Sequence, residues 1–384
     1  MQELIYFDNA ATTKVSKSVL DAMLPYLEQF YFNPSSIYSA ANFSKEAIEK
    51  ARGQVAKAIG AQSSEIYFTS CASESNNWAF DIAKKRKAQV HFITTEIEHV
   101  SVLRTAKYQE KEHKVTYLGV NDDGRISLGD LEKNITKNTS LVSIMYANNE
   151  TGVIQPIDEI AEICAKKGVL FHTDAVQAVG KLPIDVKKQK VGMLSLSGHK
   201  FHAPKGIGVL YVNKEIQFNS FLFGGSQESG KRAGTENVAN IVAIGCAIEE
   251  AMVCMQKENE KIQSLRELLF DGIMQIPQVK FNGCRNHSLP NILNFSFEGV
   301  EGEGILLHLD LNGICCSSGS ACTSGSLDPS HVLMAMGLSH ATAQGSVRIS
   351  LSKYNTQQEV HQFLDVCGPI IEKLRAISPI WQRS

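Results

Sequence analysis

One cysteine, Cys322, stands in a segment where a buried, structural thiol has no use. The run 317–326 reads Ser-Ser-Gly-Ser-Ala-Cys-Thr-Ser-Gly-Ser and holds no large apolar side chain, so we expect a mobile, solvated loop. Most free cysteines are buried and inert, whereas a thiol on an exposed loop is placed to react. Taken alone, the segment is equally consistent with a reactive nucleophile and with an incidental loop thiol.

A lysine, Lys200, comes just after the apolar run 193–196. Partial burial of an amine lowers its pKa and favours the neutral, nucleophilic form. Such a lysine can hold a carbonyl cofactor, for instance pyridoxal phosphate, as a Schiff base. The alternative is a salt-bridged or snorkelling lysine, and the nearby Lys205 is a rival for the same role.

Two further polar side chains follow apolar runs. Asp174 could pair with a protonated pyridine nitrogen, although a helix N-cap is the commoner use of an aspartate in such a place. His99 could stack on an aromatic ring or transfer protons. It could also be an ordinary surface or core histidine, one of 11 in the chain.

Three more segments are ambiguous when each is taken alone. Ser73 opens an expected helix, where free backbone amides and a hydroxyl bind phosphate, but it is equally a good N-cap. Asn148 and Asn149 indicate either a tight turn or amide donors around a ligand. Arg348 lies in an apolar strand, where a substrate carboxylate or an internal aspartate could pair with it.

Apolar runs and amphipathic stretches alternate from about residue 65, which predicts a mainly parallel sheet covered by helices on both faces. Ligands gather at the carboxyl ends of the strands in such sheets, so the polar side chains above should converge on one site. A helix over about 237–272 leads into a smaller α+β unit, with strands near 291–297 and 346–351 and helices near 303–311 and 356–376. The expected strands of the main sheet are 66–69, 91–94, 115–118, 141–145, 169–172, 193–196 and 207–211, and the helices between them 73–86, 99–110 and 156–167.

The composition is that of an ordinary soluble enzyme of about two domains, with 384 residues, 43% hydrophobic, 20% charged and a formal net charge of −2. Nothing indicates a nucleic-acid footprint, a membrane-surface patch or a membrane span. The first 13 residues do not read as a signal peptide. Nine cysteines without CxxC spacing fit reduced cytoplasmic thiols better than a disulfide framework or a zinc site.

Taken together, these segments resemble the cysteine desulfurases of the NifS/IscS type, which are class V aminotransferases of fold type I and use pyridoxal 5′-phosphate. The resemblance covers nearly the whole chain and is most specific around Lys200 and Cys322. The segments that carry it are 6–13, 33–36, 148–150, 174–177, 197–200, 232–235, 317–326 and Arg348.

The resemblance implies a fold and a reaction. The fold is α/β and aspartate-aminotransferase-like, with a large cofactor-binding domain of residues 14–258 and a small domain formed by 1–13 and 259–384. The reaction converts L-cysteine to L-alanine and leaves the sulfur as a persulfide on Cys322. An acceptor protein, most often an iron–sulfur scaffold, then takes the sulfur.

The resemblance also implies a role for each site residue. Lys200 forms the Schiff base, His99 stacks on the ring and moves protons, and Asp174 faces the ring nitrogen. Gln177 and Asn149 contact the ring substituents. The phosphate is held by Ala72, Ser73, Ser197 and His199, together with the partner subunit's Thr235 in a homodimer. Arg348 and Asn33 bind the substrate carboxylate, and Asn149 is also a substrate-binding residue.

Four residues depart from the family pattern, namely Tyr38, Cys71, Ser226 and Ser229. They concern the dimer contact and the rim of the pocket rather than a group essential to the chemistry. Two other functions stay open from the sequence. One is an aminotransferase or lyase on the same fold, with Cys322 incidental, and the other is a cofactor-free scaffold or thiol redox sensor.

Overall fold

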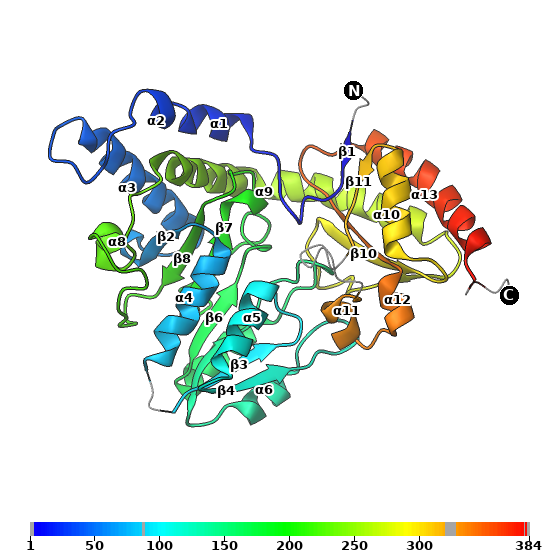
Figure 1. Ribbon diagram of the computed structural model, residues 1–384, viewed down its shortest axis with the longest axis horizontal. Helices are drawn as coiled ribbons and strands as arrows, with labels where there is room; N and C mark the ends of the chain where they lie inside the picture. The colour runs from blue at the N-terminus through cyan, green and yellow to red at the C-terminus, as the bar shows by residue number, and fades with distance from the viewer. Residues whose placement is uncertain (1–3, 87–88, 319–327, 380, 382–384) are drawn as a thin grey trace.

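The computed structural model describes residues 4–86, 89–318, 328–379 and 381 (Figure 1). Cys322 and most of the segment around it lie outside the described residues. The strands are β1 (Ile5–Tyr6), β2 (Ile66–Thr69), β3 (His91–Thr95), β4 (Lys114–Leu118), β5 (Thr139–Ser143), β6 (Leu170–Asp174), β7 (Met193–Ser197), β8 (Gly208–Val212), β9 (Val279–Phe281), β10 (Ile292–Phe297), β11 (Ile314–Cys315) and β12 (Ser346–Ser350).

Helices cover the strands and connect them. The α-helices are α1 (Lys17–Met23), α2 (Pro25–Glu28), α3 (Ala41–Ala58), α4 (Ala72–Lys84), α5 (Val100–Gln109), α6 (Leu128–Asn134), α7 (Ile157–Lys167), α8 (Gln227–Gly230), α9 (Val238–Ile273), α10 (Gly302–Leu311), α11 (His331–Ala335), α12 (His340–Gln344) and α13 (Gln357–Ile377), with 3₁₀ turns η1 (Ser63–Glu65) and η2 (Gly198–Lys200).

The main sheet has seven strands in the order β2-β8-β7-β6-β5-β3-β4. Its adjacent pairs are parallel except where β8 runs antiparallel between β2 and β7. The expectation of a mainly parallel α/β sheet is therefore confirmed. Because β3, β5, β6 and β7 run parallel to one another, their carboxyl ends lie along the same edge of the sheet.

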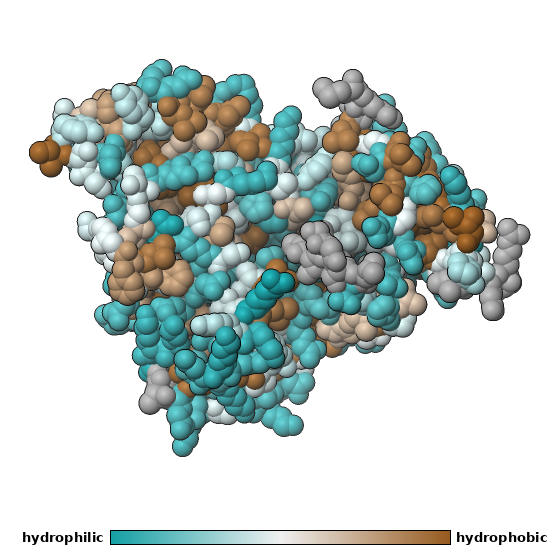
Figure 2. All heavy atoms as spheres, in the orientation of Figure 1, coloured by the Kyte–Doolittle hydropathy of each residue, from teal (hydrophilic) through white to brown (hydrophobic). Residues whose placement is uncertain are grey.

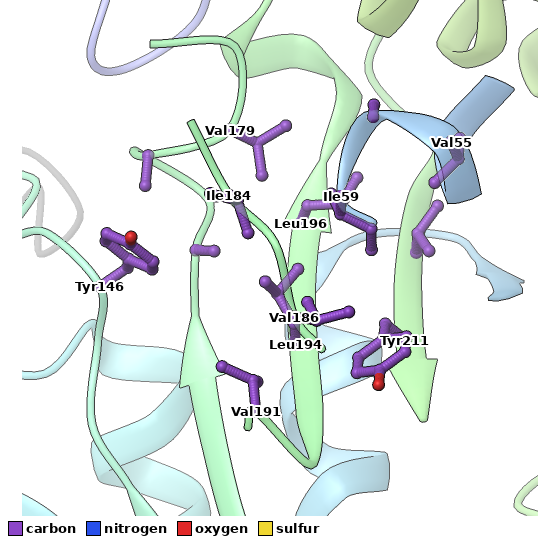
Figure 3. Close-up of a cluster of buried hydrophobic side chains, with 14 of the residues drawn as sticks. Val55, Ile59, Tyr146, Val179, Ile184, Val186, Val191, Leu194, Leu196 and Tyr211 are labelled. Atoms are coloured by element: carbon purple, nitrogen blue, oxygen red, sulfur yellow. The ribbon is translucent and has the colours of Figure 1, made fainter. Parts of the chain in front are cut away.

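Alternate side chains of the central strands enter two different cores. On β7, Leu194 and Leu196 belong to a cluster that also contains Val55 and Ile59 from the α3 region (Figure 3). Met193, on the opposite face of the same strand, packs in a second cluster with side chains of α4 and α5. The period of two along the strand therefore explains why helices cover both faces of the sheet.

A smaller unit is built on the antiparallel sheet β12-β10-β9 and on the parallel pair β1-β11. Helices α10 and α13 pack beside it (Figure 1). The helix α9 serves both units, because its buried residues up to Ile248 join the core of the large sheet and those from Ile262 onward join the core of the small one. The domain boundaries at 14, 258 and 259 remain a prediction.

By length and composition, α9 is the single helix among the described residues that could cross a membrane. It packs against α1, α3 and α13 and contributes to both cores. We therefore read α9 as a core helix that joins the two units.

Three details differ from the sequence-based expectations. The sequence patterns predict no helix in the first 65 residues, yet α1, α2 and α3 form there, and α3 packs along α9. Pro156 is the N-cap of α7 rather than its first residue. The expected loop 317–326 does not begin as a solvated segment, because Ser317 is buried and pairs with the backbone of Arg348.

Candidate active site

The polar residues at the strand ends line one cavity of about 280 Å³. Asp174 ends β6, Ser197 ends β7, and His99 and Asn149 follow β3 and β5. The convergence expected from the strand order is thus observed. The residues named from the sequence that line this cavity are Ala72, Ser73, His99, Asn149, Asp174, Gln177, Ser197, His199, Lys200 and Arg348.

Lys200 reaches into the cavity from the 3₁₀ turn η2, which directly follows β7. Its Nζ donates to the carbonyl oxygens of Ala10 at 2.7 Å and Ala11 at 2.8 Å. The N-terminal segment therefore closes the site from the side of the small unit. The rival, Lys205, is exposed and does not line this cavity, so the geometry favours Lys200.

An asparagine on α4, Asn76, links Asp174 to His99. Its Nδ2 donates to Asp174 Oδ2 at 2.8 Å and to Ser101 Oγ at 2.9 Å, and that hydroxyl lies 2.8 Å from His99 Nδ1. Asn76 was not predicted as a site residue from the sequence. The available signal was an amide on the apolar face of a helix, where a buried polar group needs partners.

His99 is held in one orientation as the N-cap of α5. The Ser101 backbone N–H donates to His99 Nδ1 at 3.2 Å, so the neutral ring carries its proton on Nε2. Burial lowers the pKa of His99, with Lys200 and His331 lowering it further and Asp174 opposing them. The ring is therefore neutral at neutral pH and presents an acceptor nitrogen to its own helix.

Gln177 has a side-chain oxygen in the site that accepts no hydrogen bond from the described residues. Its Nε2 donates to the Ala10 carbonyl at 3.0 Å, while its Oε1 is buried and has no hydrogen-bond partner among the described residues. A buried amide oxygen without a partner costs free energy. The cavity is therefore shaped for a ligand that donates to Gln177.

The N-terminus of α4 opens on the same cavity. Its N-cap, Cys71, is extended and makes no side-chain cap, and Cys71, Ala72 and Ser73 all line the cavity. Ser73 is therefore a first-turn residue and not the N-cap. Gly208 allows this approach, because a Cβ there would come within 2.7 Å of the Cys71 carbonyl carbon. Free first-turn amides and the helix dipole suit a phosphate or another anion.

His199 lines the cavity beside Lys200. Its Nδ1 lies 3.2 Å from Thr12 Oγ1, and burial lowers the pKa of His199 to about 4. The ring is therefore neutral and able to donate a hydrogen bond without bringing a charge.

Arg348 pairs with an internal aspartate, as one interpretation of the sequence expected, and its side chain also lines the cavity. Its Nη2 donates to Asp8 Oδ1 at 2.7 Å and its Nη1 to the Asn149 carbonyl at 2.9 Å. Its Nε is buried without a hydrogen-bond partner among the described residues. The guanidinium is thus held by an internal aspartate and keeps one donor for a ligand.

The structure supports both interpretations of the segment 148–149, because Asn148 shapes a turn and Asn149 faces the cavity. Asn148 is fully buried, and its Oδ1 accepts from the backbone N–H groups of Glu150 and Thr151, so it shapes a turn. Asn149 lines the cavity. The sequence did not indicate which of the two asparagines has which role.

Two residues named from the sequence, Asn33 and Thr235, do not line the cavity, and a third, Cys322, cannot be placed relative to it. Asn33 is exposed, and its Oδ1 accepts from the Ser35 backbone N–H at 2.9 Å. Thr235 lines a separate cavity of about 210 Å³ together with Ser70 and Arg232. Cys322 lies outside the described residues.

Two buried carboxyl groups next to the site were not predicted to have a role. Glu98 Oε1 accepts from Thr95 Oγ1 at 2.8 Å and from the Met145 backbone N–H at 2.9 Å. Burial raises the pKa of Glu98 to about 8 and that of Glu150 to about 7. Their place beside His99 and Asn149 in the sequence was the only signal.

Both carboxyl-bearing residues also hold the start of α11. Ser330 Oγ donates to Glu150 Oε2, and His331 Nε2 lies 3.0 Å from the Glu98 carbonyl oxygen. At the other end, the backbone of Ser317 pairs with that of Arg348. Ser317 and Ser330, which lie close to the two ends of 319–327, are thus anchored next to residues of the cavity.

Comparisons with known proteins give one consistent result. Residues 5–363 match the aminotransferase class-V family. A curated relative from Clostridium botulinum, called cysteine desulfurase IscS, is 50% identical over 389 residues, which cover 100% of this chain and 98% of the relative. Another cysteine desulfurase IscS, from Methanosarcina thermophila, is 48% identical over 98% of this chain and 94% of its own.

Solved structures agree with the curated relatives. A NifS-like protein superimposes with a TM-score of 0.92 at 40% identity, over 97% of this chain and 100% of its own. A second structure, described as SspA in complex with cysteine, has a TM-score of 0.80 at 39% identity, over 92% of this chain and 100% of its own. The expected fold type I architecture is therefore confirmed.

Proposed function

This chain belongs to the aminotransferase class-V family, among its cysteine desulfurases, and we propose how its own residues perform that reaction. L-Cysteine is converted to L-alanine, and the sulfur remains as a persulfide on Cys322. The observation that carries the proposal is the single cavity in which Lys200, Asp174, His99 and Arg348 meet.

The residues of the cavity fit pyridoxal 5′-phosphate. Lys200 would hold it covalently through its amine, and the first-turn amides of α4 with Ser73, Ser197 and His199 would hold its phosphate. The unpartnered Gln177 Oε1 would accept a hydrogen bond from a ring substituent, as would Asn149, and the Asp174 carboxylate would pair with a protonated ring nitrogen. When bound, the cofactor supplies an electron-withdrawing ring that stabilises negative charge on the substrate carbons.

Arg348 orients the substrate in this cavity. Its unpartnered Nε points to a role as donor to the carboxylate of L-cysteine, while Asp8 keeps the guanidinium in place. Lys200 and His99 then hold and return the protons that leave the substrate during the reaction. We retain Asn33 as a further carboxylate contact that depends on an approach of its loop to the cavity.

Sulfur leaves the substrate through Cys322. The Cys322 thiolate attacks the substrate sulfur, an S–S bond forms, and the C–S bond breaks with its electron pair remaining on carbon. A proton then completes L-alanine. The anchors at Ser317 and Ser330 hold described residues on each side of 319–327 next to the cavity, which supports the choice of Cys322 as the sulfur acceptor.

The complete site also depends on a second copy of the chain. Thr235 lies outside the cavity, in a groove beside Ser70, which supports a phosphate contact from the partner subunit's Thr235. Exposed apolar side chains gather over α1 to α3 (Figure 2), among them Leu24, Leu27 and Ile37. We therefore propose a homodimer, a cytoplasmic location, and an iron–sulfur scaffold protein as the sulfur acceptor.

The test of this function replaces Lys200 by Ala and measures cofactor retention and alanine formation. Lys200→Ala should lose the borohydride-reducible cofactor adduct and reduce alanine formation at least a thousandfold, because the amine is both anchor and proton carrier. Lys188→Ala, which removes a side chain that is 85% exposed, is the matched control and should keep both. A reducible adduct in Lys200→Ala protein would move the anchor to another lysine, with Lys205 first.

A further inference from the structure

Asn76 is a fully buried asparagine on α4, a helix whose next residues Trp78 and Phe80 are buried as well. Its Oδ1 has no hydrogen-bond partner among the described residues. A buried amide oxygen without a partner costs free energy, so the packing of α4 does not by itself explain an asparagine at this position. Its two N–H groups, by contrast, are both used, one toward Asp174 and one toward Ser101.

The Asp174 carboxylate fixes the direction of this amide. Asp174 Oδ2 accepts from Asn76 Nδ2 at 2.8 Å, and Asp174 Oδ1 accepts from the Val176 backbone N–H at 3.1 Å. Because a carboxylate only accepts hydrogen bonds, a turn of the amide by half a rotation would bring two acceptor oxygens together. Each carboxylate oxygen therefore has one donor from the chain itself, and the two donors together orient Asp174.

The Ser101 hydroxyl has a fixed direction for a similar reason. Its oxygen accepts from Asn76 Nδ2 at 2.9 Å, and its other contact among the described residues is His99 Nδ1 at 2.8 Å. An amide nitrogen does not accept hydrogen bonds, so the single proton of the hydroxyl goes to His99 Nδ1. The Ser101 backbone N–H approaches the same nitrogen at 3.2 Å. Two donors from one residue thus meet at Nδ1.

This network favours a neutral His99 ring with its proton on Nε2. A proton on Nδ1 would face two donors, and the Ser101 hydroxyl would have to turn away from it. Burial lowers the pKa of His99, Lys200 and His331 lower it further, and Asp174 opposes them. The directions of the hydrogen bonds and the direction of the pKa shift therefore agree.

We propose that Asn76 and Ser101 are positioning residues that couple His99 to Asp174. Asn76 holds the carboxylate with one N–H and directs the Ser101 hydroxyl with the other, and that hydroxyl keeps the His99 ring in its Nε2–H tautomer. One network therefore orients both side chains that are assigned to the cofactor ring. The inference rests on the proposed roles of Asp174 and His99 at that ring, but the network itself is measured in the protein without cofactor.

The test measures the pKa of His99 in the cofactor-free protein. Exchange of the imidazole C2 hydrogen for deuterium depends on protonation of the ring, so mass spectrometry of the peptide with His99 gives a midpoint pH. Ser101→Ala should raise this midpoint by about half to one unit, because it removes a donor that stabilises the neutral ring. Asn76→Leu should raise it too, because a hydroxyl released from Asn76 can turn and accept from a protonated Nδ1.

The double variant Asn76→Leu/Ser101→Ala separates this relay from a direct effect of Asn76 on Asp174. Its midpoint should equal that of Ser101→Ala, because the effect of Asn76 on His99 passes through the hydroxyl. Asn77→Leu is the matched control, since Asn77 is the next residue of α4, is exposed and donates to the Ser73 carbonyl within its own helix. This control should leave the midpoint unchanged.

An unchanged or lower midpoint in Ser101→Ala would overturn the proposal, because the hydroxyl would then not be a donor to His99. A midpoint that does not rise in Asn76→Leu, or that rises equally with and without the hydroxyl, would overturn it as well. If Asn76→Leu does not fold, as circular dichroism would show, the sign of the Ser101→Ala shift decides alone. The exchange needs neither cofactor nor L-cysteine, so a failure of this network and a failure of the desulfurase function are distinguishable.

Discussion

Lys200, Asp174 and His99 owe their positions to residues that take no part in the chemistry. Asn76 donates hydrogen bonds to Asp174 and to Ser101, whose hydroxyl contacts His99. The carbonyl oxygens of Ala10 and Ala11 accept hydrogen bonds from the Lys200 amine. The sequence predicted the reacting side chains because each follows a recognisable apolar run. It did not predict Asn76, because an amide inside a helix gives no local sign of a partner about a hundred residues away.

Glu98 makes the stability of the protein depend on pH. Burial raises its folded-state pKa to about 8 from an ordinary value of 4.5, so the native carboxyl keeps a proton that the unfolded one has lost. The stabilising contribution of the Glu98 carboxyl is therefore complete below about pH 4.5 and is lost progressively as the pH rises from there to about 8. Over that window the free energy of unfolding should fall by about 1.4 kcal/mol per pH unit because of this group.

Glu98→Gln should remove that dependence, because the amide has the same shape and does not titrate. Urea unfolding of both proteins between pH 5 and pH 8 measures the difference, in which all other titrating groups cancel. Glu112→Gln, at an exposed position, is the control and should reproduce the wild-type slope. Parallel curves for wild type and Glu98→Gln would show that the carboxyl is already ionised in the native state.

At the scale of the elements, the strand pattern was the most predictable part of the fold. The run 66–69 is β2 to the residue, and the long helix expected at 237–272 is α9 displaced by one residue. The helix α3 was not predicted, although its buried residues recur on one face, because the alternation of strands and helices starts only after it. The start of α11 could not be foreseen, since Ser330 is held by a glutamate 180 residues earlier.

The short helix α11 provides a test of the proposed anchor next to 319–327. Ser330 caps α11 and also donates to Glu150, so Ser330→Ala removes both interactions. We expect hydrogen exchange of the α11 amides to become about fivefold faster, which corresponds to roughly 1 kcal/mol. Sulfur transfer should also slow, while cofactor retention stays unchanged.

Ser339→Ala is the matched control, because Ser339 caps α12 in the same way and bonds only within its own turn. It should leave exchange in α11 as in the wild type. Equal exchange of α11 in Ser330→Ala and wild-type protein would argue against an anchor at this point.

At the scale of the whole molecule, two predicted site residues would need a second chain or another position of a loop to reach the cavity. Thr235 and Asn33 lie outside the cavity of a single chain. A pattern in one sequence does not indicate contacts between two subunits, so the roles of Thr235 and Asn33 were predicted from the family resemblance alone. The same holds for the domain boundaries, because α9 passes through both cores without a break.

The proposed homodimer predicts a particle of twice the 42.2 kDa chain mass. Phe223 is 87% exposed in the segment that leads to Thr235, so Phe223→Glu should shift the particle toward the monomer in light scattering. Leu311→Glu is the matched control, since Leu311 is 79% exposed on the small unit and should leave the mass unchanged. A monomeric wild-type protein that forms alanine at full rate would contradict the shared site.

The most direct measurement of the central claim is peptide mass spectrometry after incubation of the holoenzyme with L-cysteine, without a reductant. The account predicts one extra sulfur, confined to the peptide that carries Cys322, together with an equal amount of L-alanine in the first turnover. Cys322→Ser protein should keep the cofactor and show no added sulfur. Continued alanine formation by Cys322→Ser, or bound cofactor with no persulfide on Cys322 in the wild type, would contradict it and indicate an aminotransferase or lyase with an incidental thiol.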